Sequence, residues 1–436
     1  MSYPSRFNES THEPAGQIPL CEIQIMISRL MLAGVAEPFS VTHRSNDAKG
    51  ESMKTTQLHM GMIGVTGRGG LWRHWHDPQG RSVVVAGADI DADRLPAFCA
   101  EHGGQPFVTT DYQALLARPD VDAVAVTSPD YCHEEHAVAA LEADKHVFCE
   151  KPLAITIEGC DRILETWRRS GKRLMVGFNM RYMNIFRVMK QVVDSGAIGQ
   201  VKAAWVRHFV GLGSDFYYHD WHARRENTTS LLLQKGSHDM DMIHWITGRY
   251  TARTAAFGSL DFFGGDKPND LTCPACPERD TCTEAMYSRR IQCAFRREVD
   301  VEDNQVVIME LEGGIKAAYL QCHFTPDYHR NYTFIGTEGR VENSEPDMKV
   351  WVKTRRSNTW KDLADRTYDV KRAVGGHGGA DPVICKDFVD MVLDGVEPLA
   401  TPLAGRMSVA AGVCAAHSLR NGGMPVDVPP PPEGFR

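Results

Sequence analysis

One short unit constrains the fold of this chain more than any other feature. Leu58 to Ile63 has the apolar pattern of a buried strand and runs directly into a glycine-rich turn, Gly64 to Gly70. Helix formers follow from Leu71 to His76, and a second apolar strand pattern covers Ser82 to Ala88. A strand, a glycine turn, a helix and a strand in this order are typical of a parallel α/β unit that binds a dinucleotide.

The turn itself has the residues that a pyrophosphate requires. Glycines let the backbone approach the phosphates, and free N–H groups at the helix start supply a positive end. Asp89, 25 residues after Gly64, ends the second strand and is placed to bind the ribose hydroxyls of adenosine. Because a threonine replaces the second glycine of the usual G-x-G-x-x-G, a tight loop without a ligand is the alternative. The expected cofactor contacts in the turn are Gly64, Thr66, Gly67, Arg68 and Gly69.

Length and charge limit the classes of function. A chain of 436 residues is too long for one hydrophobic core, so two domains and an extension are expected. The net charge of -8 and the lack of a Lys/Arg-rich run argue against nucleic acid and anionic membranes as partners. Charged residues interrupt every apolar stretch before a membrane span is reached, and no secretory signal is visible. We expect a cytoplasmic protein with a small-molecule partner, whose twelve scattered cysteines are mostly free thiols.

The chain divides into three parts. Residues 1–57 have no clean periodicity and are predicted to be a poorly ordered extension, with Met53 as an alternative start. Residues 58–176 alternate strand and helix patterns, which predicts a parallel sheet. Residues 177–436 change to β-branched and aromatic alternation and predict an open, mostly antiparallel sheet with helices. The predicted fold class is therefore α/β followed by α+β.

A parallel sheet gathers the strand ends at one edge, where ligands bind. Besides the glycine turn and Asp89, two segments directly follow predicted strands: the loop from Thr127 to His133 and the tripeptide from Glu150 to Pro152. We therefore expect further cofactor contacts from Thr127, Pro129, His133, Glu150 and Lys151. The alternative for Lys151 is a solvated charge after a strand.

Several motifs in a fixed order carry a resemblance to a known family. After the turn and the Thr-Ser-Pro-Asp loop come Glu-Lys-Pro at 150–152, Gly-Phe-Asn-Met-Arg-Tyr at 177–182, Gly-Ser-His-Asp-Met-Asp at 236–241 and Gly-Thr-Glu-Gly-Arg at 336–340. Together they resemble the Gfo/Idh/MocA oxidoreductases over about residues 58 to 428. The resemblance implies a Rossmann domain carrying NAD or NADP and a second domain whose open sheet forms one wall of the substrate site. It also implies a homo-oligomer, a dimer or tetramer.

The resemblance assigns catalytic roles to particular residues. It places Lys151 beside the nicotinamide and matches His238 to a histidine that follows an acidic position by four residues; here that position is Gln234. On one predicted helix over 230–246, Gln234, His238 and Asp241 share a face by their spacing. Hydride transfer from a carbinol needs a proton acceptor and a group that holds the developing carbonyl. We expect His238 as general base, Lys151 as its partner and Asp241 as orienter, the alternative being an internal helix contact.

Substrate contacts are expected from two further segments. Arg181 and Tyr182 belong to the motif at 177–182, and His377 and Asp381 belong to a glycine-rich loop that could face a sugar. The alternative for this loop is a helix cap, because Asp381 precedes a proline.

A cysteine-rich loop at 266–298 has the spacing C-x2-C-x5-C-x10-C. Such a density of thiols suggests a structural zinc, although the spacing is not that of a common finger. Free thiols or oxidised pairs are the alternatives. The expected ligands are Cys273, Cys276, Cys282 and Cys293.

Three functions are compatible with these features. The leading hypothesis is hydride transfer between NAD and a secondary alcohol of a sugar, sugar derivative or cyclitol. An NAD-dependent glycosidase that oxidises its sugar transiently, and a non-catalytic NAD-binding sensor, are the alternatives. Asp89 favours NAD because its charge repels a 2′-phosphate. Arg68 and Arg94 keep NADP open.

Overall fold

The computed structural model describes residues 57–211, 214–287, 290–357 and 361–435. The predicted extension therefore lies outside the described residues, apart from Gln57.

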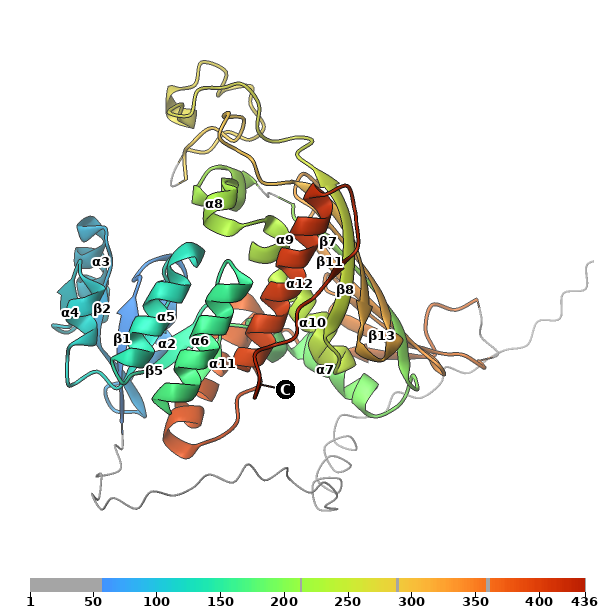
Figure 1. Cartoon of the computed structure of the whole chain (residues 1–436), viewed down its shortest axis with the longest axis horizontal. Coiled ribbons are helices and arrows are strands. Elements are labelled where there is room, and N and C mark those ends of the chain that lie inside the picture. The colour runs from blue at the N-terminus through green and yellow to red at the C-terminus, as the bar shows by residue number, and fades with distance from the viewer. Residues whose placement is uncertain (1–56, 212–213, 288–289, 358–360, 436) are drawn as a thin grey trace, which may run out of the picture. The chain divides into compact units, whose positions relative to one another are not determined.

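The first sheet has six strands, among them the strand that precedes the glycine turn. All of its strand pairs are parallel (Figure 1). The strand order is β3-β2-β1-β4-β5-β6, the order of a Rossmann domain, which confirms the predicted fold class. Its strands are β1 (Leu58–Ile63), β2 (Ser82–Ala88), β3 (Phe107–Thr109), β4 (Ala123–Val126), β5 (His146–Cys149) and β6 (Leu174–Val176).

The connections between these strands are short helices: α2 (Trp72–Trp75), α3 (Leu95–His102), α4 (Tyr112–Leu116), α5 (His133–Glu142) and α6 (Ile157–Ser170). Helix α6 shows why the sequence sets their ends. The Thr156 side chain accepts a hydrogen bond from the Gly159 N–H at its start, and Gly171 ends it with a left-handed φ of 66°. These two caps fix the start and the end of α6.

The strand order reverses between β1 and β4, and this reversal places the candidate site. Strands β1, β2, β4 and β5 run in the same direction, so the residues that follow them meet at one edge. Gly64, Asp89, Thr127 and Glu150 follow these four strands. The edge predicted from the sequence is therefore present.

A second sheet of nine strands has the order β14-β13-β12-β11-β7-β10-β9-β8-β15. All its strand pairs are antiparallel except β7 with β10. The mostly antiparallel sheet predicted for residues 177–436 is therefore confirmed. The strands are β7 (Val201–Phe209), β8 (Thr251–Ser259), β9 (Asn304–Leu311), β10 (Lys316–Cys322), β11 (His329–Gly336), β12 (Gly339–Ser344), β13 (Lys349–Thr354), β14 (Arg366–Asp369) and β15 (Val426–Asp427).

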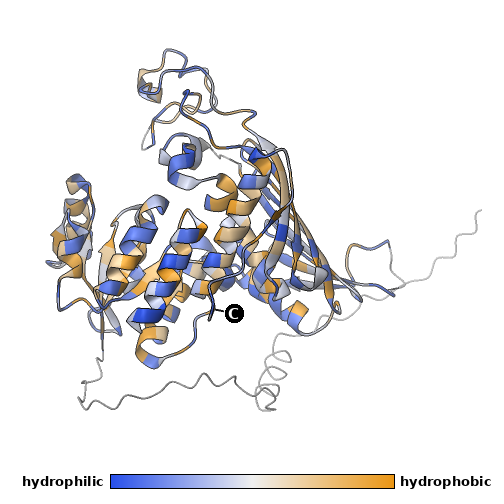
Figure 2. Cartoon of the chain, viewed as in Figure 1, coloured by the Kyte–Doolittle hydropathy of each residue, from blue (hydrophilic) through white to orange (hydrophobic). Residues whose placement is uncertain are grey.

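Helices cover one face of this sheet. Helices α7, α10 and α12 pack on it, and hydrophobic and hydrophilic residues alternate along the strands in Figure 2. The other face leaves large apolar side chains exposed, including Trp205, Phe257 and Ile308. The helices of this region are α7 (Asn184–Asp194), α8 (Arg225–Thr228), α9 (Leu231–Gln234), α10 (Ser237–Thr247), α11 (Gly376–Asp394) and α12 (Pro402–Arg420).

The last two helices join the two sheets into one packed body. Phe388 of α11 and Ala404 of α12 belong to the same buried cluster as the strands of the Rossmann sheet. The Trp75 indole donates to the Cys385 carbonyl at 3.0 Å, which fastens α11 to α2. No helix within the described ranges is long and apolar enough to cross a membrane.

Candidate active site

The glycine turn after β1 has a backbone that only glycine allows. Gly64 and Gly67 have φ angles of 88° and 58°, in the left-handed region. A Cβ on Gly69 would lie 2.2 Å from the Gly64 carbonyl oxygen, so no larger residue fits. A Cβ on Gly67 would meet no atom within 4 Å, so the turn is open on that side. An open backbone turn is what the close approach of a diphosphate requires.

Thr127, at the end of β4, closes the other side of the turn. Its hydroxyl donates to the Gly64 carbonyl oxygen at 2.6 Å, and a Cβ on Gly64 would lie 2.9 Å from the Thr127 carbonyl. Pro129 follows and begins the short 3-10 helix Asp130–Cys132. This loop therefore lies beside the turn, and its predicted cofactor contacts stay a prediction.

His133 has a different role from the predicted cofactor contact. It is buried, and its ring nitrogens lie 2.7 Å from the Pro152 carbonyl oxygen and 2.9 Å from the Ser128 carbonyl oxygen. Both nitrogens are thus used within the protein. We correct the prediction: His133 fastens the loop after β4 to the segment after β5.

Asp89 lies at the end of β2 beside the turn. Its carboxylate accepts hydrogen bonds from the backbone N–H groups of Val65 at 3.2 Å and Asp91 at 3.1 Å. Nη1 of the exposed Arg94 lies 3.8 Å from this carboxylate and 3.0 Å from the Thr66 hydroxyl. The predicted acid and one predicted arginine therefore meet at the same end of the turn.

Arg68 points from the turn into a different cluster. Its Nε lies 2.7 Å from the Glu150 carboxylate and its Nη1 lies 3.2 Å from Asp381. His377 Nδ1 lies 3.0 Å from Arg68 Nη1 and 2.9 Å from Asp381. The predicted glycine-rich loop is thus held against the turn, and its histidine is engaged with Arg68 and Asp381.

Lys151 follows β5 and reaches the second domain. Its Nζ donates to the backbone carbonyl oxygen of Gln234 at 3.0 Å. Gln234 ends α9, and His238 stands in the first turn of α10. The two segments that the motifs connect with catalysis therefore meet, one from each domain.

The helix predicted over 230–246 is interrupted. Helix α9 ends at Gln234 and α10 begins at Ser237, with Lys235 and Gly236 between them. A Cβ on Gly236 would lie 2.4 Å from the Leu232 carbonyl oxygen, so the chain passes too close there for any other residue. The spacing argument for one shared helix face is therefore wrong, although Gln234 and His238 still meet Lys151.

Three of the buried polar atoms that lack a hydrogen-bond partner among the described residues belong to side chains around Lys151. They are Asp130 Oδ2, Gln234 Oε1 and His238 Nδ1. Gln234 is in contact with Lys151, and the Lys151 charge lowers the pKa values of both Asp130 and His238. Unpaired buried polar atoms are costly, so their grouping around one lysine indicates a place for polar groups of a ligand.

Burial and charge set the protonation of this group. Burial, followed by the Lys151 and Arg330 charges, lowers the pKa of His238 well below its ordinary value, so the imidazole is neutral. Burial also lowers the pKa of Lys151, against the opposing charges of Asp130 and Glu150. Burial raises the pKa of Asp130 to about 6, against the charges of His133 and Lys151. A neutral base and a carboxylic acid that titrates near neutrality suit proton transfer.

Asp241, Arg181 and Tyr182 do not lie with these groups, which corrects three predictions. Both Asp241 oxygens are bound by Arg181, at 2.8 Å from Nε and 2.6 Å from Nη2, and both side chains are buried. Asp241 is therefore paired with the expected substrate arginine and does not orient His238. Tyr182 is buried and donates its hydroxyl to Asp387. These side chains fasten the start of the second domain to α10 and α11.

Sequence reasoning missed two residues of this site. Asp130 was visible as the acid of the Thr-Ser-Pro-Asp loop at the correct sheet edge, but the tertiary contact with Gln234 was not. Lys235 had no signal, because it lay inside a helix that was predicted to continue.

The four clustered cysteines share one small cavity. Cys273, Cys276, Cys282 and Cys293 line a space of about 20 Å³ together with His219. Within the described residues, no three His, Cys, Asp or Glu side chains are arranged to hold a metal ion. Burial raises the pKa values of Cys273 and Cys293, so these thiols stay protonated. The structural zinc therefore stays a prediction, and the cysteines that the structure describes form no disulfide.

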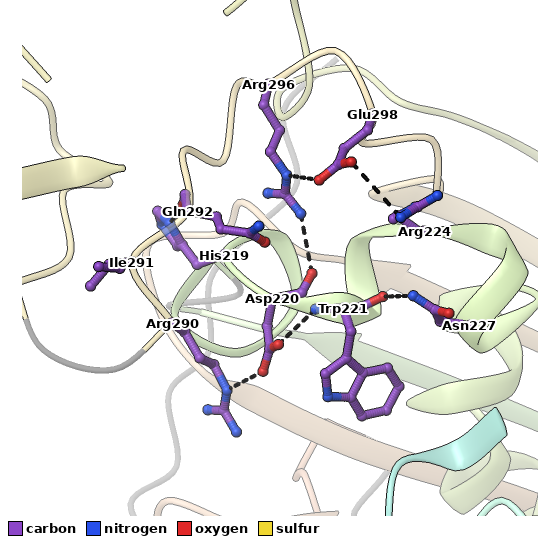
Figure 3. A pocket seen from close by; sticks show the side chains of 10 residues that line it. All are labelled: His219, Asp220, Trp221, Arg224, Asn227, Arg290, Ile291, Gln292, Arg296 and Glu298. Carbon is purple, nitrogen blue, oxygen red and sulfur yellow. Dashed lines mark hydrogen bonds and ion pairs between the residues drawn. The ribbon is translucent and has the colours of Figure 1, made fainter. Parts of the chain in front are cut away.

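A larger cavity of about 380 Å³ lies between the cysteine-rich loop and the segment before α8 (Figure 3). Arg290 lies 2.8 Å from Asp220, and the buried Arg296 lies 2.6 Å from Glu298. Trp221 stacks on His222 at 3.6 Å and meets Tyr131 of the loop after β4 edge-on at 5.7 Å. The cavity therefore adjoins the loop that carries Asp130.

Fold, turn and site together define an oxidoreductase with an NAD-binding Rossmann domain. Residues 58–178 match the family model described as "Oxidoreductase family, NAD-binding Rossmann fold", and residues 186–342 match the "GFO/IDH/MocA C-terminal domain". The chain belongs to the Gfo/Idh/MocA family. It is a nicotinamide-dependent dehydrogenase of the type that acts on CH–OH groups, as predicted.

Named relatives and solved structures agree with this membership. The chain is 47% identical over 299 residues to inositol 2-dehydrogenase of Pseudomonas savastanoi pv. phaseolicola, covering 66% of this chain and 76% of the relative. It is 26% identical over 385 residues to inositol 2-dehydrogenase of Salmonella typhimurium, covering 86% and 97%. The fold is shared with an oxidoreductase domain protein from Kribbella flavida (TM-score 0.73, 20% identity, 86% and 100% covered) and with levoglucosan dehydrogenase in complex with NADH and levoglucosan (TM-score 0.70, 19% identity, 86% and 100% covered).

Proposed function

We propose that this protein transfers a hydride between NAD and a secondary alcohol carbon of a sugar, sugar derivative or cyclitol. The observation that carries the proposal is the group of unpaired buried atoms around Lys151, namely Asp130 Oδ2, Gln234 Oε1 and His238 Nδ1. Neighbouring hydroxyls of a polyol can donate a hydrogen bond to each of these atoms. Relatives named inositol 2-dehydrogenase and levoglucosan dehydrogenase support a substrate of this class.

In the proposed mechanism, a bound nicotinamide supplies the hydride acceptor or donor. The turn at 64–70 holds the diphosphate, and Asp89 accepts hydrogen bonds from ribose hydroxyls. Lys151 donates a hydrogen bond to the reacting oxygen and stabilises the charge that develops there. The neutral His238 accepts the hydroxyl proton as the carbonyl forms, and Asp130 exchanges protons with this pair.

Asp130 is an argument against the alternative function, a non-catalytic NAD-binding sensor. The resemblance places a carboxylate at the position of Gln234, and its loss there favoured the sensor. The structure has a buried carboxylate, Asp130, whose pKa is raised to about 6 by burial, while the charges of His133 and Lys151 and a hydrogen bond with the Gln234 side chain oppose that shift. We infer that Asp130 supplies the acid that position 234 lacks, which supports catalysis.

We further propose that NAD is preferred to NADP. Asp89 would repel a 2′-phosphate. Arg68 is committed to Glu150 and Asp381 and is not available to offset that repulsion. Arg94 is the remaining arginine that could bind a 2′-phosphate. Its ion pair with Asp91, at 2.9 Å, competes with such binding.

The same assay tests the reaction and the cofactor. The purified chain is mixed with NAD or NADP and a panel of free sugars, inositols and aryl glycosides, while nicotinamide absorbance and aglycone release are followed together. We expect reduction of NAD by at least one polyol, and weaker binding of NADP in a titration. Aglycone release without net NAD reduction would show the glycosidase instead, and NAD binding without either reaction would show the sensor.

We also propose a homo-oligomer built on the open face of the nine-stranded sheet. Trp205, Ala318 and Ile308 stand in one register row across β7, β10 and β9, and Trp205 and Ile308 are 62% and 56% exposed. Phe257 and Val306 form a neighbouring row with exposures of 63% and 44%. A contiguous apolar face of this kind is typical of a protein interface, and a second copy presents the same face.

A further inference from the structure

Lys235 lies at the junction between α9 and α10, with no counter-ion among the residues that the structure describes. Its Nζ lies 5.7 Å from the ring centroid of Tyr217 and 5.8 Å from that of Tyr328. Within the described residues, this ammonium has no hydrogen bond or ion pair, and the two phenol hydroxyls have no hydrogen-bond partner either. Aromatic faces stabilise a cation, but they leave its N–H donors unsatisfied.

The surroundings of Lys235 carry an excess of positive charge. Burial lowers its pKa to about 7, with further lowering by the Arg330 and Lys151 charges. Asp239 and Glu345 act in the opposite direction with smaller effect. Asp239 already forms an ion pair with Arg330 at 3.1 Å, so its negative charge is largely neutralised by that guanidinium. An anion placed at Lys235 would therefore be favoured by the field of the site.

Lys235 belongs to the same site as the proposed catalytic groups. It directly follows Gln234, whose carbonyl oxygen binds Lys151. Its charge lowers the pKa of His238 and, with that of Lys151, the pKa of His222. Tyr217, which holds Lys235, also meets His222 edge-on at 5.5 Å. The ammonium therefore lies within electrostatic reach of the reacting groups, on the side of Tyr217 and His222.

We propose that Lys235 binds a carboxylate of the substrate, so that the substrate is a sugar acid or a carboxylated cyclitol. This inference rests on the proposed function and narrows its substrate class. One unpaired ammonium and two phenol donors match the two oxygens of a monoanionic carboxylate. A phosphate dianion would call for more free donors, and Arg330, the nearby guanidinium, is already bound to Asp239. In this proposal Lys235 selects carboxylated substrates over neutral ones.

The test compares matched substrates that differ only in the group at C6. Glucose and glucuronate, galactose and galacturonate, and glucose 6-phosphate are supplied to the NAD-loaded full chain, and kcat/KM is measured for each. We expect the carboxylated member of at least one pair to be preferred by about tenfold or more. In Lys235→Met this preference should fall by about 10- to 100-fold, as expected for the loss of a charged hydrogen bond. Lys235→Arg should keep part of it.

Lys386→Met, on the exposed surface of α11, is the matched control and should keep the wild-type preference. An equal or greater rate with neutral sugars, or a carboxylate preference unchanged in Lys235→Met, would overturn the proposal. A preference for the phosphate over both uronates would overturn the carboxylate assignment.

A binding measurement separates this inference from the proposed reaction. Thermal shift of the NAD-loaded chain with glucuronate or galacturonate needs no turnover. A shift that Lys235→Met abolishes and Lys386→Met preserves would support the carboxylate site even if no compound reduced NAD. The absence of any shift with either uronate, or a shift equal in wild type and Lys235→Met, would refute it.

Discussion

At the scale of single residues, the pKa of the buried carboxylate Asp130 is set by burial and by neighbouring charges, which act in opposite directions. Burial disfavours its charged form and raises its pKa to about 6, while the charges of His133 and Lys151 oppose that shift. A group with this pKa changes its charge within the range in which enzymes work. It is therefore able both to accept and to return a proton.

This position predicts a pH dependence. Asp130 is protonated below about pH 6 and ionised above it, so a role as proton acceptor is lost as the pH falls through about 6. We expect kcat/KM of the wild type to fall on that acidic side, and Asp130→Asn to lose this inflection along with about two orders of magnitude in rate. The pH profile from 5 to 8 checks this. Asp120→Asn, which changes an exposed carboxylate, should keep the inflection, and its persistence in Asp130→Asn would contradict the role.

A second residue-scale prediction concerns Lys151. Lys151→Ala should lower the rate of single-turnover hydride transfer by about two to four orders of magnitude, because the donor to the reacting oxygen is lost. NAD affinity should change little, since the turn at 64–70 holds the diphosphate. Stopped-flow absorbance and NAD titration measure the two quantities. Near wild-type turnover in Lys151→Ala would show that another group performs this step.

At the scale of elements, the site depends on how α10 is seated. Asp239, next to His238, is fully buried and accepts hydrogen bonds from Tyr319 at 2.8 Å and from Tyr332, both on strands of the large sheet. Helix α10 is thus fixed by its contacts with the sheet, and His238 is carried with it.

The break between α9 and α10 gives a prediction about Gly236. Gly236→Ala should lower the free energy of unfolding by about 1–3 kcal/mol, because the new Cβ would lie 2.4 Å from the Leu232 carbonyl oxygen and the chain must shift. Urea denaturation measures this. Gly104→Ala, where the new Cβ would meet only the His102 side chain, should stay within about 0.5 kcal/mol of the wild type. Equal stability of both variants would argue against a required glycine at 236.

At the scale of the whole molecule, the two sheets have different tasks. The Rossmann sheet is covered by helices and presents one edge to the cofactor. The nine-stranded sheet is covered by helices on one face only, and its open face carries the apolar rows around Ile308 and Val306. This one-sided covering is stable when another surface removes the open face from water.

Ile308→Asp should therefore dissociate the proposed oligomer. A carboxylate at the centre of the proposed interface would lose its hydration without gaining a partner. Light scattering after size exclusion should show a smaller assembly than that of the wild type. Ile90→Asp makes the same substitution at a site that is 92% exposed in the Rossmann domain and should leave the assembly size unchanged. A wild type that is already monomeric would refute the interface.

The sequence by itself determined the Rossmann sheet, its ligand edge and the family. Each of these features depends on residues that are close together in the sequence. They are glycines at left-handed φ angles, the periodicities of strands and helices, and residues that directly follow strands. It did not determine which side chains meet across the domains. The partners of Asp241 and Asp130 are 60 and more than 100 residues away, at Arg181 and Gln234, and a break of two residues at 235–236 altered the helix face. Only the tertiary structure decided these pairings, because they depend on how two sheets and their helices pack, and no local period records that packing.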